Sequence, residues 1–278
     1  MNDCVSLGIK PVPDDVRKIE YAITTSMVEY GYDHTKPPII QDYSLTINKG
    51  NVCAILGPNG RGKTTFLKLL LGILKPRAGS IEVNGKIAFV PQLFHVSFPY
   101  RVLDMVLMGL ARKIGLFSLP SHKDEAIALE ALTRLGLAHL AEHNFDELSG
   151  GQRQLIIFAR ALASGADILV LDEPTSALDL KNQGIVLEWI NHLAREEGLT
   201  VIFTTHHPHH AHAIADQSLL MFSDENYAYG SIDEVLTEEN LHRLYGVEMR
   251  RVDFEHQGEH LEILVPIYTG LRQLTGGR

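Results

Sequence analysis

A glycine-rich segment between two apolar stretches constrains the fold of this chain more than any other feature. The segment GPNGRGKTT spans residues 57–65 and directly follows residues 52–56, VCAIL, which are typical of a buried strand. The residues after it, TTFLKLLLGIL, repeat apolar side chains at helical spacing. The pattern therefore predicts a strand, a tight turn and a helix in succession, with the turn at the N-terminus of the helix.

The residue types in this turn indicate a phosphate site. Its glycines permit φ > 0, so that successive N–H groups can point into one concavity at the positive end of the helix dipole. Lys63 can reach the β- and γ-phosphates of a nucleotide, and the Thr64 hydroxyl can coordinate Mg²⁺. The segment matches the P-loop pattern G-x-x-x-x-G-K-[ST] in full and predicts a nucleoside triphosphate site. The residues expected to bind the nucleotide here are Gly57, Pro58, Asn59, Gly60, Arg61, Gly62, Lys63, Thr64 and Thr65.

Composition narrows the class of protein. The chain has 278 residues, of which 45% are hydrophobic and 21% charged, enough for one large α/β domain or a main domain with a small appendage. The net charge of −9 argues against a general nucleic-acid-binding surface. Two cysteines argue against a disulfide framework, and no apolar run approaches the roughly 18 to 20 residues that span a bilayer. We therefore expect a cytoplasmic location without a secretory signal, so any membrane role must act through a partner.

Strand-like and helical segments alternate over most of the chain, which predicts an α/β fold with a mainly parallel sheet covered on both faces. Residues 1–25 contain prolines and mixed charge and predict an irregular extension, with the strand-like pattern beginning at Ser26. The main domain is expected over residues 26–247, interrupted by a helical insertion at about 97–160. Residues 248–278 are expected to form a separate C-terminal extension.

Two tight turns predict β-hairpins. Asn84-Gly85 lies between two short strand-like segments and has the composition of a hairpin turn. Gln257-Gly258 lies between two alternating segments near the C-terminus. We therefore expect one hairpin within the main domain and one in the C-terminal extension.

Two carboxylates follow a second apolar segment. Residues 168–171, ILVL, lead directly into Asp172 and Glu173. A buried parallel strand ending here would place both side chains at the carboxyl edge of the sheet, where the glycine-rich turn also opens. Asp172 could then hold Mg²⁺ and Glu173 could polarise an attacking water. An acidic turn after a core strand is the alternative that the segment alone leaves open.

A second helix start also has the character of a phosphate site. Residues 148–154, LSGGQRQ, place Ser149, Gly150 and Gly151 before the helical stretch QRQLIIFARALA. An ordinary P-loop ATPase does not require such a segment. The chain thus has two helix N-termini suited to phosphate.

With these motifs in this order, the chain resembles the nucleotide-binding subunits of ATP-binding cassette (ABC) transporters over roughly Ser26 to Leu220. The resemblance implies a P-loop NTPase core with a mainly parallel sheet, an antiparallel β subdomain and an inserted α-helical subdomain. It also implies that two copies sandwich two ATP molecules head to tail. The residues that would contact the γ-phosphate held by the opposite copy are then Ser149, Gly150, Gly151 and Gln152.

The same resemblance assigns further roles. Gln92 in FVPQ matches the Q-loop glutamine, which senses Mg²⁺ and the γ-phosphate, and Asp179 in SALD matches the D-loop at the dimer interface. His206 in FTTHH matches the switch histidine, which contacts the γ-phosphate. Tyr32 is the candidate for stacking on adenine, with Tyr30 as the alternative. The implied catalytic residues are Glu173, His206 and Gln92, and the implied Mg²⁺ ligands are Thr64, Gln92 and Asp172.

Two positions depart from the family pattern. Arg61 stands where the family usually has a small residue, and we expect its side chain to point outward and leave nucleotide binding intact. His207 replaces the usual Asp after the switch histidine, and His209, His210 and His212 follow. Imidazoles at this spacing can share a metal ion, whereas one switch histidine followed by a solvated helix start is the simpler interpretation.

The segments FVPQ, VLDMVLMG and TTHHPHHA are most similar to importer ATPases for metal chelates or related solutes: ferric siderophores, haem, cobalamin, and especially molybdate and tungstate. The implied partners are a second copy of the chain, an integral-membrane permease and, indirectly, an extracytoplasmic solute-binding protein, with no nucleic acid. The chain would lie on the cytoplasmic face of the membrane, held through the permease. An exporter ATPase, or a soluble ABC protein acting on nucleic acid or ribosomes, is the alternative.

Overall fold

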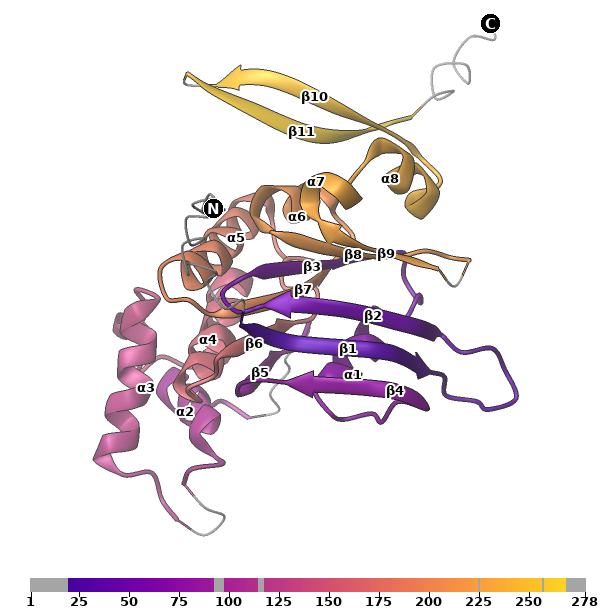
Figure 1. The fold of residues 1–278 in the computed structure, drawn as a ribbon. Helices are drawn as coiled ribbons and strands as arrows, with labels where there is room; N and C mark the ends of the chain where they lie inside the picture. Colours follow the sequence, from indigo (N-terminus) through magenta and orange to yellow (C-terminus); the bar gives the residue numbers. More distant parts are fainter. Residues whose placement is uncertain (1–19, 93–97, 115–117, 225, 257, 269–278) are drawn as a thin grey trace, which may run out of the picture.

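The computed structural model describes residues 20–92, 98–114, 118–224, 226–256 and 258–268 (Figure 1). Two sheets, with helices between and around them, form the body of this part, and a C-terminal hairpin lies at one end. Most of the expected N-terminal extension, residues 93–97 after Gln92, and residues 269–278 lie outside the described residues.

Six strands form the central sheet, in the spatial order β5-β6-β7-β3-β8-β9. All neighbours are parallel except β9, which runs antiparallel to β8. The predicted, mainly parallel sheet is confirmed. Its strands are β3 (Val52–Leu56), β5 (Ile87–Val90), β6 (Ile168–Leu171), β7 (Thr200–Thr205), β8 (Gln217–Met221) and β9 (Tyr227–Ser231).

Strand β3 shows why its sequence is apolar throughout. All five of its residues are buried, because side chains alternate between two covered faces of the sheet. Cys53 and Ile55 belong to a core shared with helix α1 (Lys63–Leu70). Val52, Ala54 and Leu56 belong to the larger core shared with the helices of the opposite face. The side chains of β3 are therefore apolar on both faces of the sheet.

A separate antiparallel sheet covers α1 from the other side. Its strands are β1 (Tyr21–Tyr30), β2 (Ile40–Asn48) and β4 (Ala78–Val83), in the order β2-β1-β4. Ile23 and Tyr43 of this sheet pack with Phe66 of α1 in one core. The antiparallel β subdomain expected from the family resemblance is therefore present, and α1 with the preceding turn is fixed between two sheets.

The prediction of a β-hairpin around Asn84-Gly85 is wrong. The strand before the turn, β4, pairs with β1, whereas the strand after it, β5, pairs with β6. Lys86 N donates to Asp167 Oδ2 at 2.8 Å, which draws the chain after the turn to the central sheet. The turn thus carries the chain from one sheet to the other.

The first strand begins at Tyr21 rather than at Ser26. Irregular pairing explains why the alternation of apolar and polar residues did not reveal the first part of this strand. Strand β1 has register shifts between Thr25 and Val28, and Met27 has φ 49°. A bulged strand loses the period of two on which sequence patterns depend.

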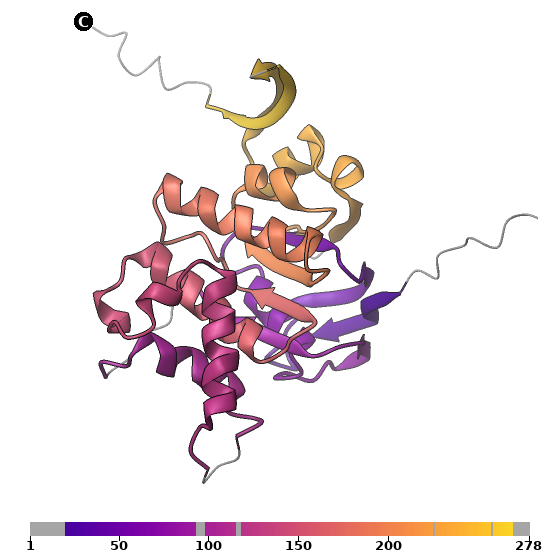
Figure 2. The same cartoon turned by 90° about the vertical axis from the view of Figure 1, so that its left-hand side faces the viewer.

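The middle of the chain is helical, as the sequence predicts. Figures 1 and 2 show α2 and α3 at one side of the central sheet. Ser121 caps α3, and Ser149 caps α4, each with a reciprocal capping box. The elements are α2 (Val102–Leu107), η1 (Met108–Leu110), α3 (His122–Arg134), η2 (Ala138–Leu140), η3 (Phe145–Glu147) and α4 (Gly150–Ala163).

The C-terminal hairpin predicted around Gln257-Gly258 is confirmed by the pairing of β10 with β11, with His256 opposite Glu259. The hairpin lies beyond α8 and is tied to α6 by a hydrogen-bond contact of 2.8 Å between His212 Nε2 and Glu262 Oε1. The domain boundaries themselves stay predictions. The remaining elements are α5 (Leu180–Arg195), α6 (Pro208–Ile214), α7 (Ile232–Val235), α8 (Glu238–Tyr245), β10 (Glu248–His256) and β11 (Glu259–Ile267).

Among the residues that the structure describes, every helix is too short or too polar to cross a bilayer.

Candidate nucleotide-binding site

The glycine-rich turn joins β3 to α1, as the sequence predicts. Gly62 is the N-cap of α1 with φ 104°, and a Cβ there would lie 2.6 Å from Ile39 Cγ2. No side chain caps this helix start, so its first N–H groups face the turn. Backbone conformation and close packing therefore both require glycine at this position.

Lys63 is buried at the base of this turn, with 6% of its side chain exposed. Its Nζ donates to the carbonyl oxygen of Gly57 at 2.8 Å and lies 3.4 Å from Glu173 Oε1. These contacts place the one ammonium group of the turn between the backbone oxygens of the loop and the carboxylate that follows β6.

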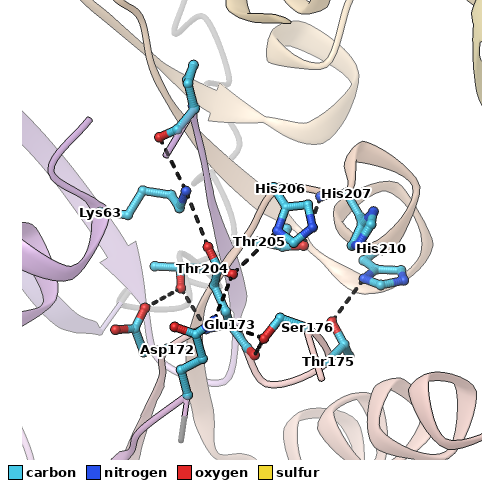
Figure 3. A network of polar contacts seen from close by, with 12 residues as sticks. Lys63, Asp172, Glu173, Thr175, Ser176, Thr204, Thr205, His206, His207 and His210 are labelled. Carbon is cyan, nitrogen blue, oxygen red and sulfur yellow. Dashed lines mark hydrogen bonds and ion pairs between the residues drawn. The ribbon is translucent and has the colours of Figure 1, made fainter. Parts of the chain in front are cut away.

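The predicted pair of carboxylates lies at the carboxyl edge of the central sheet, beside the turn (Figure 3). Thr64 Oγ1 donates to Asp172 Oδ2 at 2.9 Å, and Thr204 Oγ1 donates to Asp172 Oδ1 at 2.8 Å. Glu173 N donates to Thr204 Oγ1 at 2.8 Å, while Glu173 itself has φ 45°. Sequence reasoning missed Thr204, because nothing local shows that β7 lies next to β6.

Glu173 is the centre of the polar network. Its Oε2 lies 3.4 Å from His206 Nδ1, and Gln92 Nε2 donates to the same oxygen at 3.4 Å. Gln92 Nε2 also donates to Ser176 Oγ at 3.1 Å. The three residues assigned catalytic roles thus come together from the ends of β5, β6 and β7.

A pocket of about 410 Å³ opens over the turn. Tyr32 lies at its rim, 59% exposed, with its hydroxyl 3.1 Å from Thr65 Oγ1. Tyr30 packs edge-on against Tyr32, with ring centroids 5.2 Å apart. The lining residues are Tyr32, Ile39, Pro58, Asn59, Gly60, Gly62, Lys63, Thr64, Thr65, Gln92 and Glu173.

Arg61 turns away from this pocket but not into solvent. Its Nε donates to the carbonyl oxygen of Phe222, and the side chain is half-buried. The expected outward orientation therefore holds only with respect to the pocket. The side chain is hydrogen-bonded to the loop after β8, and Arg61 is not among the residues that line the pocket.

The second phosphate-type helix start lies elsewhere. Ser149 is the N-cap of α4: its Oγ accepts from Gln152 N at 3.3 Å, and its own N–H donates to Gln152 Oε1 at 3.1 Å. Ser149 and Gly150 are exposed, as is Asp179, the N-cap of α5. None of these residues is among those lining the pocket described above. Within one chain, the two helix starts do not meet.

The histidine segment after β7 is only partly solvated. His206 is followed by His207, whose ring centroid lies 4.0 Å away, and His210 is 3% exposed. The interpretation of this segment as a solvated helix start is therefore wrong for His210. The part of the chain that the structure describes contains no group of three or more His, Cys, Asp or Glu side chains placed to hold a metal ion, so the metal-site alternative gains no support.

Comparison with known proteins decides the family. The family model described as ABC transporter matches residues 40–176. The chain is 47% identical over 237 residues to the molybdate import ATP-binding protein MolC of Haemophilus influenzae, covering 84% of this chain and 92% of that protein. The chain belongs to the ABC transporter family. It is an ATP-binding cassette of that family, and the recognised resemblance is confirmed.

Solved structures confirm the fold of the cassette. One, described as a metal-chelate type ABC transporter in an inward-facing conformation, matches with a TM-score of 0.86 and 43% identity, over 90% of this chain and 99% of that chain. A dimeric ABC cassette with ADP and phosphate bound matches with a TM-score of 0.64 and 27% identity, over 76% of this chain and 98% of that chain. The P-loop NTPase fold class is therefore confirmed.

We expect Gly151→Ala to destabilise the cassette. A Cβ at Gly151 would lie 2.4 Å from Asn182 Oδ1 and 2.7 Å from Asn182 Cγ, and Asn182 is held by two hydrogen bonds to Asp179. Overpacking of this kind costs about 1–3 kcal/mol of unfolding free energy, measurable by urea denaturation. In Gly184→Ala, the matched control on α5, the new Cβ meets nothing within 4 Å and a small gain in stability is expected. Equal stability of Gly151→Ala and wild type would contradict the close approach.

Proposed function

We propose that the cassette hydrolyses ATP to power an ABC importer for a metal chelate or oxyanion, with molybdate and tungstate as the first solutes to test. The observation that carries the proposal is that Lys63 and Glu173 line one pocket, with Asp172 hydrogen-bonded to Thr64 beside it, in a chain similar to a molybdate import ATP-binding protein. Ferric siderophores, haem and cobalamin are the other solutes of this group.

The pocket residues fit a nucleotide with Mg²⁺. The N–H groups at the start of α1 and the Lys63 ammonium would bind the β- and γ-phosphates, and Tyr32 would stack on adenine. Thr64, Asp172 and Gln92 supply hydroxyl, carboxylate and amide oxygens, which are the hard ligands that Mg²⁺ prefers. When bound, this ion would neutralise phosphate charge.

Glu173 is the proposed general base. Its carboxylate would orient and polarise the attacking water, and His206 would contact the γ-phosphate from beside it. Lys63, 3.4 Å from Glu173 Oε1, would stabilise negative charge that develops on the phosphate oxygens. Each of these side chains comes from the end of a different central strand or from the turn between β3 and α1.

A second copy of the cassette is proposed to complete each site. Ser149, Gly150 and Asp179 are exposed but lie outside the pocket, and the neighbouring Leu180 side chain is 84% exposed. In a head-to-tail dimer, the start of α4 in one copy would face the γ-phosphate held by the other. ATP would then join the copies, and hydrolysis would release them.

The remaining partners follow from the proposed role. An integral-membrane permease would hold the cassette on the cytoplasmic face of the membrane and receive the movement of dimer closure. An extracytoplasmic solute-binding protein would act on the permease and so only indirectly on the cassette. The net charge of −9 fits a role without nucleic acid.

The proposal is tested by co-expressing the cassette with a permease encoded beside it and reconstituting the purified complex in lipid vesicles with the corresponding solute-binding protein. ATP turnover is measured with molybdate, tungstate, a ferric siderophore, haem or cobalamin, and with sulfate as the matched oxyanion control. We expect one of these five solutes, but not sulfate, to stimulate ATP turnover. The same solute should accumulate on the side of the membrane that holds the cassette and ATP. Failure to form a complex, or export of the solute, would refute the importer assignment.

A further inference from the structure

A closed series of contacts leaves Glu173 and returns to the same turn (Figure 3). His206 Nδ1 lies 3.4 Å from Glu173 Oε2, and the His206 ring lies 4.0 Å from the His207 ring, measured between centroids. The His207 ring in turn lies 4.8 Å from the His210 ring. His210 Nδ1 lies 3.2 Å from the hydroxyl of Thr175, two residues after Glu173. The segment that follows β7, from His206 into α6, and the loop after β6 are thus connected at two places.

The connection between His210 and Thr175 is shielded from water, since each residue is 3% exposed. Burial, and then the neighbouring His209, His207 and His206, lower the pKa of His210 to about 3. The ring is therefore neutral near pH 7, with one donor and one acceptor nitrogen. Nδ1 can form a hydrogen bond with the Thr175 hydroxyl in either direction.

The turn that this bond anchors is strained. Glu173 has φ 45°, a conformation that a residue with a side chain keeps only where its surroundings enforce it. Glu173 N donates to Thr204 Oγ1 at 2.8 Å, and Ser176 N donates to the carbonyl oxygen of Glu173 at 3.2 Å. The bond from His210 adds an anchor on the side of α6.

We propose that His210 is a positioning residue for ATP turnover, which holds the Glu173 carboxylate in register with the His206 imidazole by bonding Thr175 and packing against His207. The proposal rests on the proposed function, because it concerns the same site. His210 is not among the residues that line the nucleotide pocket, so it acts through its neighbours. It should therefore affect the rate of hydrolysis and not the binding of ATP.

Two substitutions remove this bond from opposite ends. Thr175→Val deletes the hydroxyl with little change of shape, and His210→Phe keeps a ring against His207 but deletes Nδ1. Each is expected to lower kcat about tenfold, because small misplacement of a catalytic group has large effects on rate, while KM and the Kd for ATP change less than about twofold. The double variant should be no slower than the slower single variant, since both remove the same interaction.

Two controls separate positioning from general damage. Thr175→Ser retains the hydroxyl and is expected to keep most of the wild-type kcat. His122→Phe makes the same exchange at a fully exposed ring on α3, outside this network, and should turn over as wild type.

The proposal would be overturned by a wild-type kcat in both Thr175→Val and His210→Phe. It would also be overturned if the two losses of kcat multiplied in the double variant, or if the single variants lost affinity for ATP and kept their kcat. The same holds if Thr175→Ser is as slow as Thr175→Val. The proposed ATPase function is judged separately, by turnover of the wild-type chain and its dependence on Glu173.

Discussion

Glu173→Gln is expected to lower ATP turnover by about two to four orders of magnitude while ATP still binds, because a general base contributes a factor of this size. Glutamine keeps the shape of the side chain but cannot accept a proton from water at neutral pH. It also retains an oxygen and a nitrogen for the contacts to Lys63, Gln92 and His206, each about 3.4 Å away. The pocket should therefore stay assembled and fail only in the chemical step.

Turnover of Glu173→Gln is measured by phosphate release, and ATP binding by equilibrium titration. Closed dimers should accumulate with ATP in size-exclusion chromatography, since the nucleotide that joins the copies is no longer cleaved. Glu188→Gln, which changes an exposed carboxylate on α5, is the matched control and should turn over normally. Normal phosphate release from Glu173→Gln would show that the base has been assigned to the wrong residue.

Lys63→Ala is expected to weaken ATP binding by about 100-fold, equivalent to about 2.7 kcal/mol of binding free energy. The substitution removes the ammonium group that lies between the P-loop carbonyls and Glu173. The carboxylates of Asp172 and Glu173 would then face the phosphates without this compensating charge.

ATP binding by Lys63→Ala is checked by isothermal titration calorimetry. Lys68→Ala is its control, because Lys68 lies on the same helix but does not line the pocket. Circular dichroism establishes that both variants are folded. Wild-type affinity in Lys63→Ala would mean that the turn does not hold the triphosphate as proposed.

Local sequence predicted the parts of the site that depend on neighbours in the chain. The strand, turn and helix around Lys63 formed where expected, and residues 168–171 end in Asp172 and Glu173 at the edge of the sheet. Apolar run, glycine position and helical spacing are all local properties. These properties are sufficient to predict a strand, turn or helix when that element is regular.

Predictions failed where a distant segment decides the structure. Asn84-Gly85 has the composition of a hairpin turn, but β1 lies more than fifty residues earlier and takes β4 as its partner. Arg61 is held by the carbonyl oxygen of Phe222, which no local pattern reveals. The same is true of His210, which the sequence suggested was solvated and which burial places beside Thr175.

The separation of the two phosphate-type helix starts is the central observation. A chain that could complete its own site would place Ser149 and Gly150 over the turn that holds Lys63, and this fold does not. In the proposed dimer, the start of α4 from the second copy would lie over this turn instead. Hydrolysis should therefore depend on pairing.

The most direct test is to measure ATP turnover per chain over a dilution series, together with the fraction of dimer by sedimentation in the same ATP-containing buffer. Turnover is expected to fall in proportion to that fraction and to approach zero where only monomer sediments. Undiminished turnover per chain in a solution of monomers would contradict the account.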